Sequence, residues 1–518
     1  MAEVASRSSA AIVFIGFMAA GKTRAAEAAA ERLGTNALDA DHLIEQELGE
    51  PIASFFEREG EAEFRRREEE LVLRLLGEAA DDGPMVLALG GGAIESERVR
   101  EALREHLAVW CDVDEETAWE RAQGSGRPLA ADRREFSRRF AERSALYESV
   151  ARAILPSRAR DAAGPAAPWL AAMLESPGAR MAWALSAGGS YPAIVGTGVI
   201  SLLDRVRDER LFCVADAAAL RAHEGLLPQR EDTIEVEGSE SSKTISEAER
   251  VLGEFARAGV RRDDCLLAFG GGVVGDLAGF CAATYQRGIP LVQAPTTLVA
   301  QVDSAYGGKT GVDLPEGKNY IGAFHQPLAV LADPDTLTTL SREELAAGFV
   351  EVVKTALIAG GTLWERVRQM DSLNPAELGD VIFACARTKI EVVAEDERDS
   401  GRRAVLNLGH TVGHAIEADT GYERYRHGEA VGLGLLAALR LSDADELRDE
   451  VSGLLEAHGL PTSLDAEVDT EGVMEAVGRD KKRTSDGVGF VLLQRPGEPR
   501  WGESVEPDRV RAAVEELR

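Results

Sequence analysis

The sequence predicts an α/β fold with three successive parts, and three observations lead to that prediction. The chain opens with a short apolar segment, a glycine loop that ends in Gly-Lys-Thr, and an alanine-rich helical segment. A second apolar segment from Leu266 runs into another glycine loop, and three of the eight histidines lie between His410 and His427. We therefore expect a P-loop domain with a parallel sheet and helices on both faces, a Rossmann-like α/β domain, and a mostly helical domain. A chain of 518 residues is too long for a single core.

The composition excludes two classes of partner. The formal net charge is -31, and nucleic acid or an anionic membrane surface would require a basic face. No apolar run reaches the roughly 20 residues that a membrane-spanning helix needs, and residues 1–9 lack the pattern of a signal peptide. The five cysteines are scattered without a CxxC pair, which is typical of reduced core thiols. We expect a cytoplasmic protein that acts on small molecules.

Lysine is rare in this chain, and its positions indicate functional sites. A lysine ammonium is a compact charge with a tunable pKa, and the planar fork of arginine does not replace it on a phosphate or carboxylate. Nearly all the lysines lie in glycine-rich or histidine-rich segments. The eight lysines of the chain are Lys22, Lys243, Lys309, Lys318, Lys354, Lys389, Lys481 and Lys482. Chance retention would account for one or two of them, so we treat them as candidate site residues.

The first glycine loop has the context of a nucleoside triphosphate site. A strand at residues 11–15 precedes GFMAAGKT at residues 16–23, and a helix at residues 24–33 follows. In such a loop, backbone N–H groups at the helix N-terminus bind phosphates, the lysine neutralises them, and the hydroxyl reaches Mg²⁺. The sequence therefore predicts ATP with Mg²⁺ at this loop.

Candidate residues for an acceptor substrate follow along the first domain. A second strand ends in LDAD at residues 38–41, which places Asp39 and Asp41 at the carboxyl edge of the sheet, where α/β proteins bind ligands. A third strand at residues 85–89 runs into three glycines, whose missing side chains let a small ligand approach the backbone. GSGRP at residues 124–128 predicts a hinge that carries an arginine, as in a lid over a phosphate.

These motifs together resemble shikimate kinase. GFMAAGKT, LDADHLIE, EFRRREEE, LALGGGA, GRPL and ERSALY occur in that order over residues 11–175. The resemblance implies phosphorylation of shikimate by ATP with Mg²⁺. It assigns the nucleotide and Mg²⁺ to Gly16, Gly21, Lys22, Thr23, Arg121 beside the adenine, Arg127 in the lid, and Asp39, which would support the metal shell. It assigns shikimate to Asp41, which would also activate the hydroxyl, and to Arg65, Gly91 and Arg143.

A segment rich in proline, glycine and alanine at residues 156–181 marks a domain boundary. We expect a last helix at residues 166–175, so the first domain covers residues 1–175 and a linker covers residues 176–181. Beyond it, strands alternate with helices and acidic residues follow strand ends, which favours a dinucleotide-binding fold. The loop GGGVVGDLAG at residues 270–279 suits a pyrophosphate at a helix N-terminus, and no GK[ST] follows that would make it a second P-loop.

The histidine-rich segment predicts a divalent metal site. His410 and His414 are four residues apart in a helical segment, so both rings should project from one face. His427 follows a turn signal and would have to fold back toward them. Clustered histidines with carboxylates elsewhere favour zinc. Spacing alone leaves open whether all three bind one metal or whether the helical pair merely faces core or solvent.

The chain from residue 182 to residue 518 resembles 3-dehydroquinate synthase. The motifs include QAPTTLVAQVDSAYGGKTGVD, GKNYIGAFHQP, GFVEVVKTALI, DERDSGRRAVLNLGHTVGHAIE and RHGEAVGLG. The resemblance implies an NAD-binding half at residues 182–335 and a helical metal- and substrate-binding half at residues 336–518. It implies conversion of 3-deoxy-D-arabino-heptulosonate 7-phosphate to 3-dehydroquinate and phosphate, with NAD⁺ and zinc or cobalt.

The same resemblance assigns roles to individual residues. It gives the zinc to Glu351, His410 and His427, and leaves His414 free to hydrogen-bond the departing phosphate. It gives NAD⁺ to Asp216, Glu240, Lys243, Gly271, Gly272, Asp276, Thr296, Thr297, Asp303 and Lys318. It gives the substrate to Arg287, Lys309, Asn319, Lys354, Lys389, Arg403, Asn407, His414 and Lys481. Either Lys481 or its neighbour Lys482 would reach the substrate.

The two resemblances together imply a bifunctional enzyme of the shikimate pathway, and two alternatives stay open. The first domain could be a regulatory ATP-binding module, although Asp41, Arg65 and Arg143 are all present for an acceptor. The remainder could be another sugar-phosphate cyclase, although Lys389 and Arg403 fit the dehydroquinate-forming pattern. The resemblance also implies a homodimer through the synthase half.

Overall fold

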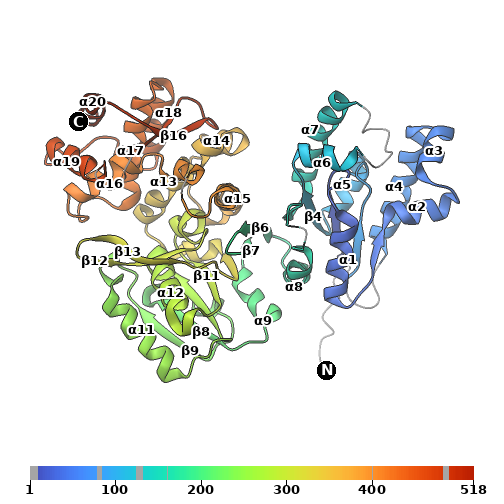
Figure 1. The fold of residues 1–518 in the computed structure, drawn as a ribbon, viewed down its shortest axis with the longest axis horizontal. Coiled ribbons are helices and arrows are strands. Elements are labelled where there is room, and N and C mark those ends of the chain that lie inside the picture. Colours follow the sequence, from blue (N-terminus) through green and yellow to red (C-terminus); the bar gives the residue numbers. More distant parts are fainter. Residues whose placement is uncertain (1–9, 79–83, 124–131, 160, 400, 482–488) are drawn as a thin grey trace. The chain divides into compact units, whose positions relative to one another are not determined.

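The computed structural model describes residues 10–78, 84–123, 132–159, 161–399, 401–481 and 489–518 (Figure 1). The chain divides into two compact units. The first unit comprises Met1–Trp183 and Thr197–Asp208, and the second comprises Ala184–Gly196 and Glu209–Arg518. Within the described part of the chain, every helix is too short or too polar to span a lipid bilayer.

A parallel sheet forms the centre of the first unit. Its strands, in spatial order, are β2 (Ala37–Asp39), β3 (Val86–Ala88), β1 (Ile12–Ile15), β4 (Leu107–Asp112), β5 (Ala153–Pro156) and β6 (Arg180–Ser186). The chain crosses from β1 toward β2 and from β3 back past β1 to β4. Right-handed crossovers in opposite directions place helices on opposite faces, which agrees with the predicted fold. The central strand β1 is buried along its length, which explains its uninterrupted apolar sequence.

Nine helices of the first unit are described around this sheet. They are α1 (Lys22–Leu33), α2 (Ala40–Leu48), α3 (Ile52–Glu59), α4 (Glu61–Gly77), α5 (Glu97–Leu103), α6 (Glu115–Ala122), α7 (Arg133–Val150), α8 (Ala163–Met173) and α9 (Leu203–Val206). The alanine-rich helices α1 and α8 pack against each other (Figure 1). Small side chains permit such a close helix pair, which explains the alanine content of both segments.

The division of the structure differs from the predicted linker at residues 176–181. The last helix, α8, ends at Met173. Strand β6 begins at Arg180, and its residues 181 and 182 pair with residues 153 and 154 of β5. Residues 197–208 also belong to the first unit. Composition marked one break in the chain, but it could not show that the chain returns to the first unit after entering the second.

The second unit is also built around parallel strands. Its strands, in spatial order, are β7 (Gly189–Val195), β14 (Ala329–Ala332), β11 (Leu291–Pro295), β10 (Cys265–Gly270), β8 (Leu211–Asp216) and β9 (Asp232–Val236). The helices α10 (Ala217–His223), α11 (Ile245–Ala258) and α12 (Gly272–Thr284) connect strands of this sheet, and β12 (Lys309–Leu314) pairs with β13 (Gly317–Phe324) in an antiparallel hairpin. This is the predicted Rossmann-like half.

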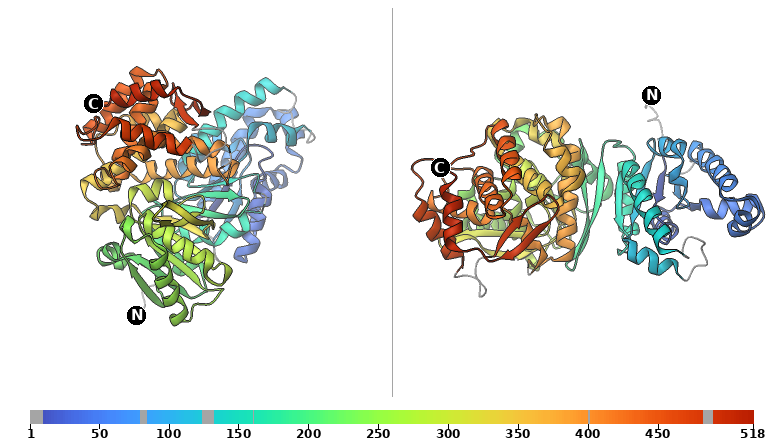
Figure 2. Two further views of the ribbon diagram at one scale, coloured as in Figure 1. Left: turned by 60° about the vertical axis from the view of Figure 1, so that its left-hand side comes forward. Right: turned by 90° about the horizontal axis from the view of Figure 1, so that it is seen from above.

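The rest of the second unit is mostly helical, as predicted. It contains α13 (Arg342–Ala359), α14 (Gly361–Val367), α15 (Gly379–Glu395), α16 (His410–Asp419), α17 (His427–Leu441), α18 (Asp445–Ala457), α19 (Thr470–Lys481) and α20 (Pro507–Glu515), with the hairpin β15 (Phe490–Leu493) and β16 (Pro499–Glu503). Figure 1 and the left view of Figure 2 show these orange and red helices gathered to one side of the green α/β half.

Glycines bring the histidine-bearing helices into close contact. A Cβ on Gly434 of α17 would lie 2.0 Å from the carbonyl oxygen of Gly409, just before α16. A Cβ on Gly428 of α17 would lie 1.9 Å from the carbonyl oxygen of Ala347 on α13. Only glycine allows backbones to approach this closely. The glycines of GHTVGHAIE and HGEAVGLG therefore hold α13, α16 and α17 together, and each of these helices contributes one residue to the predicted metal site.

All five cysteines are buried, so their thiols should not react in the folded protein. Burial raises the pKa of Cys111, Cys213 and Cys281 to about 12, and the reactive thiolate is then nearly absent at neutral pH. We expect no rapid labelling by an aromatic disulfide reagent at pH 7.5, and five labelled thiols per chain in guanidinium chloride. A thiol that reacts within seconds in the native protein would contradict the buried positions.

Candidate active sites

The first glycine loop folds as a phosphate-binding loop in front of α1. Gly16 has a φ of 147°, and a Cβ there would lie 2.7 Å from the carbonyl oxygen of Cys111. Gly21 has a φ of 90° and precedes Lys22, which begins α1. Lys22 Nζ donates to the carbonyl oxygen of Phe17 across the loop at 3.1 Å. The loop and the helix N-terminus therefore present backbone N–H groups beside a lysine, as phosphate binding requires.

The residues predicted for Mg²⁺ and adenine flank this loop. Thr23 Oγ1 donates to Asp39 Oδ2 at 2.6 Å, so the predicted hydroxyl and carboxylate are already in contact. Arg121 of α6 donates to the carbonyl oxygen of Ala19 at 3.3 Å. Together with residues between 155 and 163, Arg121 lines a cleft of about 250 Å³ beside the loop. The cleft therefore adjoins the residue that was predicted to contact adenine.

The three glycines after β3 accommodate the protein's own side chains. A Cβ on Gly90 would lie 2.5 Å from Asp41 Oδ1, and a Cβ on Gly92 would lie 2.0 Å from Arg65 Nη1. Asp41 lies in the first turn of α2, because the strand that was predicted to end at Asp41 ends at Asp39. The glycines at 90 and 92 therefore let Asp41 and Arg65 approach the backbone. Gly91, the glycine predicted to contact shikimate, accepts a hydrogen bond from Tyr147 Oη through its carbonyl oxygen at 2.6 Å.

Two arginines predicted for shikimate converge near this loop. Arg143 of α7 is 2% exposed, and its guanidinium lies 5.7 Å from the ring centre of Phe17 in the phosphate loop. Arg65 of α4 donates to Glu68 at 2.5 Å. Burial raises the pKa of Glu68, although the charge of Arg65 opposes that shift. Arg65 Nε and Arg143 Nη2 are buried nitrogens without a hydrogen-bond partner in the structure. Unsatisfied guanidinium N–H groups suit a substrate carboxylate.

The residues predicted for NAD⁺ follow the carboxyl ends of the parallel strands in the second unit. Asp216 ends β8, Gly271 precedes α12 directly after β10, and Thr297 follows β11. A Cβ on Gly271 would lie 3.0 Å from Thr297 Cγ2, so these two loops are in contact. Dinucleotides bind at this edge of an open parallel sheet. The positions of these residues therefore support the predicted cofactor site.

A polar network connects the predicted cofactor residues with a predicted substrate residue. Lys243 Nζ lies 2.5 Å from Asp276 Oδ2 and 2.5 Å from Asn319 Oδ1. Burial raises the pKa of Asp276, and the charge of Lys243 opposes that shift. Lys318 Nζ lies 3.4 Å from Glu240 Oε1. Lysines singled out by their rarity therefore pair with carboxylates at this site.

A cavity of about 650 Å³ in the second unit gathers most of the predicted substrate and metal residues. Its volume is typical of a site for a small metabolite. The predicted residues that line it are Asp276, Asp303, Lys309, Asn319, Lys354, Lys389, Arg403, Asn407, His410, His414 and His427. These residues span more than one hundred positions of the sequence, from Asp276 to His427, and the fold brings them to one cavity.

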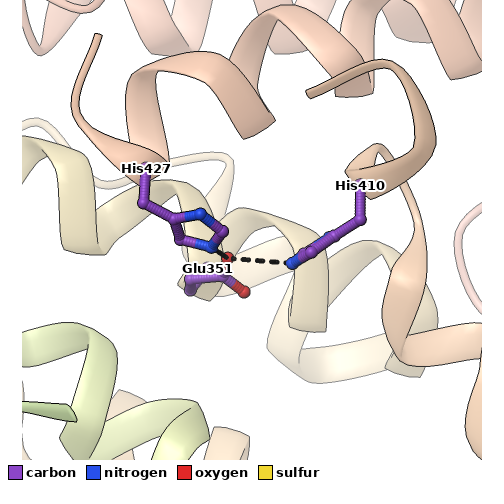
Figure 3. A group of neighbouring side chains, drawn as sticks. All are labelled: Glu351, His410 and His427. Atoms are coloured by element: carbon purple, nitrogen blue, oxygen red, sulfur yellow. Dashed lines mark ion pairs between the residues drawn. The ribbon is translucent and has the colours of Figure 1, made fainter. Parts of the chain in front are cut away.

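Glu351, His410 and His427 form a compact cluster beside this cavity (Figure 3). His410 Nε2 lies 3.7 Å from Glu351 Oε1, and His427 Nε2 lies 3.5 Å from the same oxygen. Glu351 projects from α13, whereas the two histidines begin α16 and α17 and point toward it (Figure 3). A tetrahedral zinc site with ligands at about 2.0–2.1 Å separates those ligands by roughly 3.3 Å. The observed separations therefore fit one zinc ion closely.

The chemistry of the cluster also fits a cation. Glu351 is fully buried, with Lys354 Nζ 2.5 Å from its Oε2 atom and both histidine Nε2 atoms facing its Oε1 atom. Burial, reinforced by the charge of Lys354, lowers the pKa of His410 to about 3, so this imidazole is in the neutral form that binds metals. A buried carboxylate oxygen that faces a neutral imidazole and a second histidine is an arrangement that a divalent ion would stabilise.

Each histidine of the cluster has a hydrogen-bond acceptor beside its Nδ1 atom. His410 Nδ1 lies 3.2 Å from the carbonyl oxygen of Leu408, and His427 Nδ1 lies 3.4 Å from Glu417 Oε2. If Nδ1 of each ring carries the proton, the lone pair of each Nε2 faces Glu351. Metal-binding histidines commonly use such an acceptor to select the tautomer. Glu417 also forms a second histidine–carboxylate group with His414 and His427.

Buried lysines and carboxylates form a chain along the wall of the cavity. Lys354 Nζ lies 2.5 Å from Glu351 Oε2 and 3.5 Å from Asp303 Oδ2. Lys389 pairs with the other oxygen of Asp303 and donates to its backbone carbonyl at 2.7 Å. Burial opposes ionisation of Asp303, but Lys354 and Lys389 outweigh it and lower the pKa to about 2. Burial lowers the pKa of Lys389.

Several predicted residues lie elsewhere or have partners of their own. Arg403 lines the cavity, but its guanidinium donates to the backbone carbonyls of residues 307 and 397. Arg287 is exposed in a short turn and does not line the cavity of its own chain. Arg127, Lys482 and the side chain of Lys481 lie outside the described residues.

The structure adds three residues that the sequence did not indicate. Glu417 orients His427, and Asp399 lines the cavity and pairs with Lys309. Glu95 lies between Arg65 and Arg143 in the first unit. A carboxylate in a segment rich in acidic residues carries no local signal. Of the three, only Glu417 could have been noticed, because it lies one helical turn after His414.

Different parts of the chain match different protein families. The shikimate kinase family matches residues 18–171, the 3-dehydroquinate synthase N-terminal family matches residues 233–347, and the 3-dehydroquinate synthase C-terminal family matches residues 348–483. The 3-dehydroquinate synthase of Symbiobacterium thermophilum is 44% identical over 354 residues, covering 63% of this chain and 98% of that protein. The chain belongs to the 3-dehydroquinate synthase family. It is fused at its N-terminal side to a shikimate kinase domain, which confirms the predicted bifunctional enzyme of the shikimate pathway.

Solved structures support the fold of the synthase. The 2-epi-5-epi-valiolone synthase from Streptomyces hygroscopicus subsp. jinggangensis 5008, solved with NAD⁺ and Zn²⁺, is 25% identical with a TM-score of 0.59, covering 65% of this chain and 99% of that chain. A 2-deoxy-scyllo-inosose synthase complexed with carbaglucose-6-phosphate, NAD⁺ and Co²⁺ is 24% identical with a TM-score of 0.57, with the same coverage. The higher identity to a 3-dehydroquinate synthase disfavours the alternative of another cyclase. The kinase match likewise disfavours a purely regulatory first domain.

Proposed function

We propose that the synthase converts 3-deoxy-D-arabino-heptulosonate 7-phosphate with NAD⁺ and with a zinc or cobalt ion held by Glu351, His410 and His427. The observation that supports the metal most strongly is the fully buried Glu351 carboxylate, whose Oε1 atom lies 3.7 and 3.5 Å from two histidine Nε2 atoms. NAD⁺ and the metal together supply transient oxidation and polarisation of a ring hydroxyl. The close grouping of Glu351, His410 and His427 and the cofactors named for the two solved relatives support this proposal.

The side chains around the cavity match the charges of this substrate. Lys309, Lys354 and Lys389 line the cavity and offer cationic donors to a phosphate and a carboxylate. Lys389 has a pKa lowered by burial, so it gives up a proton more readily than an exposed lysine. His414 lies beside the metal cluster, with its ring centre 5.1 Å from that of His410. We assign His414 to the departing phosphate, where an imidazole can hold or transfer a proton.

The kinase residues divide between the two substrates. Lys22 and Thr23 bind the ATP phosphates and Mg²⁺, with Asp39 supporting the metal through its contact with Thr23. Asp41 binds the shikimate hydroxyl and accepts its proton. Arg65 and Arg143 hold the shikimate carboxylate. The unsatisfied nitrogens of the arginines support the last assignment. The lid at Arg127 and the homodimer stay predictions.

Steady-state assays of both activities on the intact chain, with and without a metal chelator, test these proposals. We expect the chelator to abolish cyclisation, because the buried cluster binds a transition metal. The kinase should recover fully once Mg²⁺ is restored in excess, and the synthase should recover only with zinc or cobalt. Cyclisation at the full rate in a protein shown to be free of transition metal would contradict the assignment of Glu351, His410 and His427.

A further inference from the structure

Glu95 of the kinase lies between the two arginines assigned to the shikimate carboxylate. It ends a short 3₁₀ turn, Ala93–Glu95, directly after the glycine loop. Arg143 Nε donates to Glu95 Oε1 at 2.9 Å, and Arg65 Nε lies 3.8 Å from Glu95 Oε2. One carboxylate therefore faces guanidinium groups from α4 and α7, with one oxygen toward each.

Each of the two arginines also lies over an aromatic ring. The guanidinium of Arg143 packs on the ring of Phe17, and that of Arg65 lies 5.4 Å from the ring centre of Phe64. Arg143 is 2% exposed, so solvent cannot compensate its charge. Arg65 Nε and Arg143 Nη2 nevertheless lack a hydrogen-bond partner. The pair of arginines therefore has more donors than Glu95 satisfies.

Glu95 can leave this position without disturbing the backbone. Arg100 donates to the backbone carbonyls of Ile94 and Glu95 at 2.8 Å each, so the turn is held independently of the Glu95 side chain. That side chain is 40% exposed, and it borders an open cleft lined also by Arg65 and Gly92. Rotation about its side-chain bonds would move the carboxylate into solvent, where it is well hydrated.

We propose that Glu95 is an internal carboxylate that occupies the position of the shikimate carboxylate and must be displaced when shikimate binds. The inference rests on the proposed function, in which Arg65 and Arg143 hold that group. Glu95 neutralises the buried Arg143 between turnovers and competes with the substrate for the same donors. The competition raises the KM for shikimate and leaves the phosphoryl-transfer step unchanged, because Glu95 has moved away by then.

Steady-state kinetics of Glu95→Gln test this proposal. Glutamine keeps the shape of the side chain but removes the charge, so we expect the KM for shikimate to fall about three- to tenfold with kcat and the KM for ATP unchanged. The matched control is Glu97→Gln, which removes the same charge from an exposed position two residues away and should leave all three constants unchanged. Shikimate methyl ester, which has no carboxylate charge, should show a much smaller gain with Glu95→Gln.

A second pair of variants separates this inference from the proposed function. If Arg143→Lys and Arg65→Lys raise the KM for shikimate while Glu95→Gln leaves it unchanged or raises it, the arginines bind the substrate and Glu95 does not compete with it. If the arginine variants leave the KM unchanged, the proposed shikimate site itself is wrong. Thermal denaturation of Glu95→Gln, with a melting temperature within about two degrees of the parent, confirms that the fold is retained.

Discussion

His410→Ala is expected to lose its metal and its synthase activity, whereas His414→Ala is expected to keep the metal. The two histidines lie one turn apart on α16, with ring centres separated by 5.1 Å. Of these two histidines, His410 directs Nε2 toward Glu351, at 3.7 Å from Oε1. Removal of a direct ligand should weaken metal binding by more than about 100-fold, because even residues that merely orient ligands contribute 10- to 100-fold.

The effect on cyclisation should be of comparable size. A metal acting on a developing charge contributes several kcal/mol, which corresponds to a rate loss of roughly 10³-fold. His414→Ala should lose activity through slower phosphate departure alone. The measurements are zinc per chain by mass spectrometry after dialysis against a weak chelator, together with the cyclisation rate with added zinc. The kinase rate of each variant, assayed with Mg²⁺, serves as the control for overall folding.

A second histidine–carboxylate group gives this experiment a definite alternative. His414, Glu417 and His427 also place their ligand atoms within 4.8 Å of one another. Glu417, however, lies 3.4 Å from His427 Nδ1, whereas Glu351 Oε1 faces the Nε2 atoms of both His410 and His427. We therefore assign the metal to Glu351. If His414→Ala releases zinc as readily as His410→Ala does, the metal occupies the second group and our assignment is wrong.

Local sequence patterns predicted the loops and the fold correctly. The phosphate loop, the turn after β10 and the helix that carries His410 and His414 each depend on a few adjacent residues, such as Gly21 before Lys22. These features follow from backbone sterics and helical periodicity, which a short window of sequence contains. The alternation of strands and helices predicted the parallel strands of both units, but it did not predict their spatial order.

Contacts between distant segments could not be predicted from local sequence patterns. Spacing grouped His414 with the other histidines, and only the family resemblance brought in Glu351, which lies far earlier in the chain. The network of Glu95 with Arg65 and Arg143 joins three elements, and none of them shows a local signal for it. Charged residues are common on helix surfaces, so residue type alone could not separate the buried Arg143 from its exposed neighbours, and only the resemblance to shikimate kinase singled it out.

Lys22→Ala is expected to reduce shikimate phosphorylation by about 10²–10³-fold, the effect of removing one preorganised group from a transferring phosphate. Lys22 begins α1 behind a left-handed Gly21, so its ammonium lies where the loop collects phosphate charge. The synthase activity of the same variant should be unchanged, because every described residue of the metal cluster and its cavity belongs to the second unit.

Lys22→Arg makes this prediction specific to lysine. The chain uses arginine for most of its cations, so a site that needed only positive charge would accept the exchange. The planar guanidinium is larger than an ammonium and cannot occupy the space inside the loop, where Nζ lies 3.1 Å from the Phe17 carbonyl. We therefore expect Lys22→Arg to be nearly as inactive as Lys22→Ala, whereas Arg32→Ala at the far end of α1 should retain full activity. A kinase that tolerates Lys22→Arg would show that general positive charge is sufficient at the phosphates, and the scarcity of lysine would then carry no functional meaning at this position.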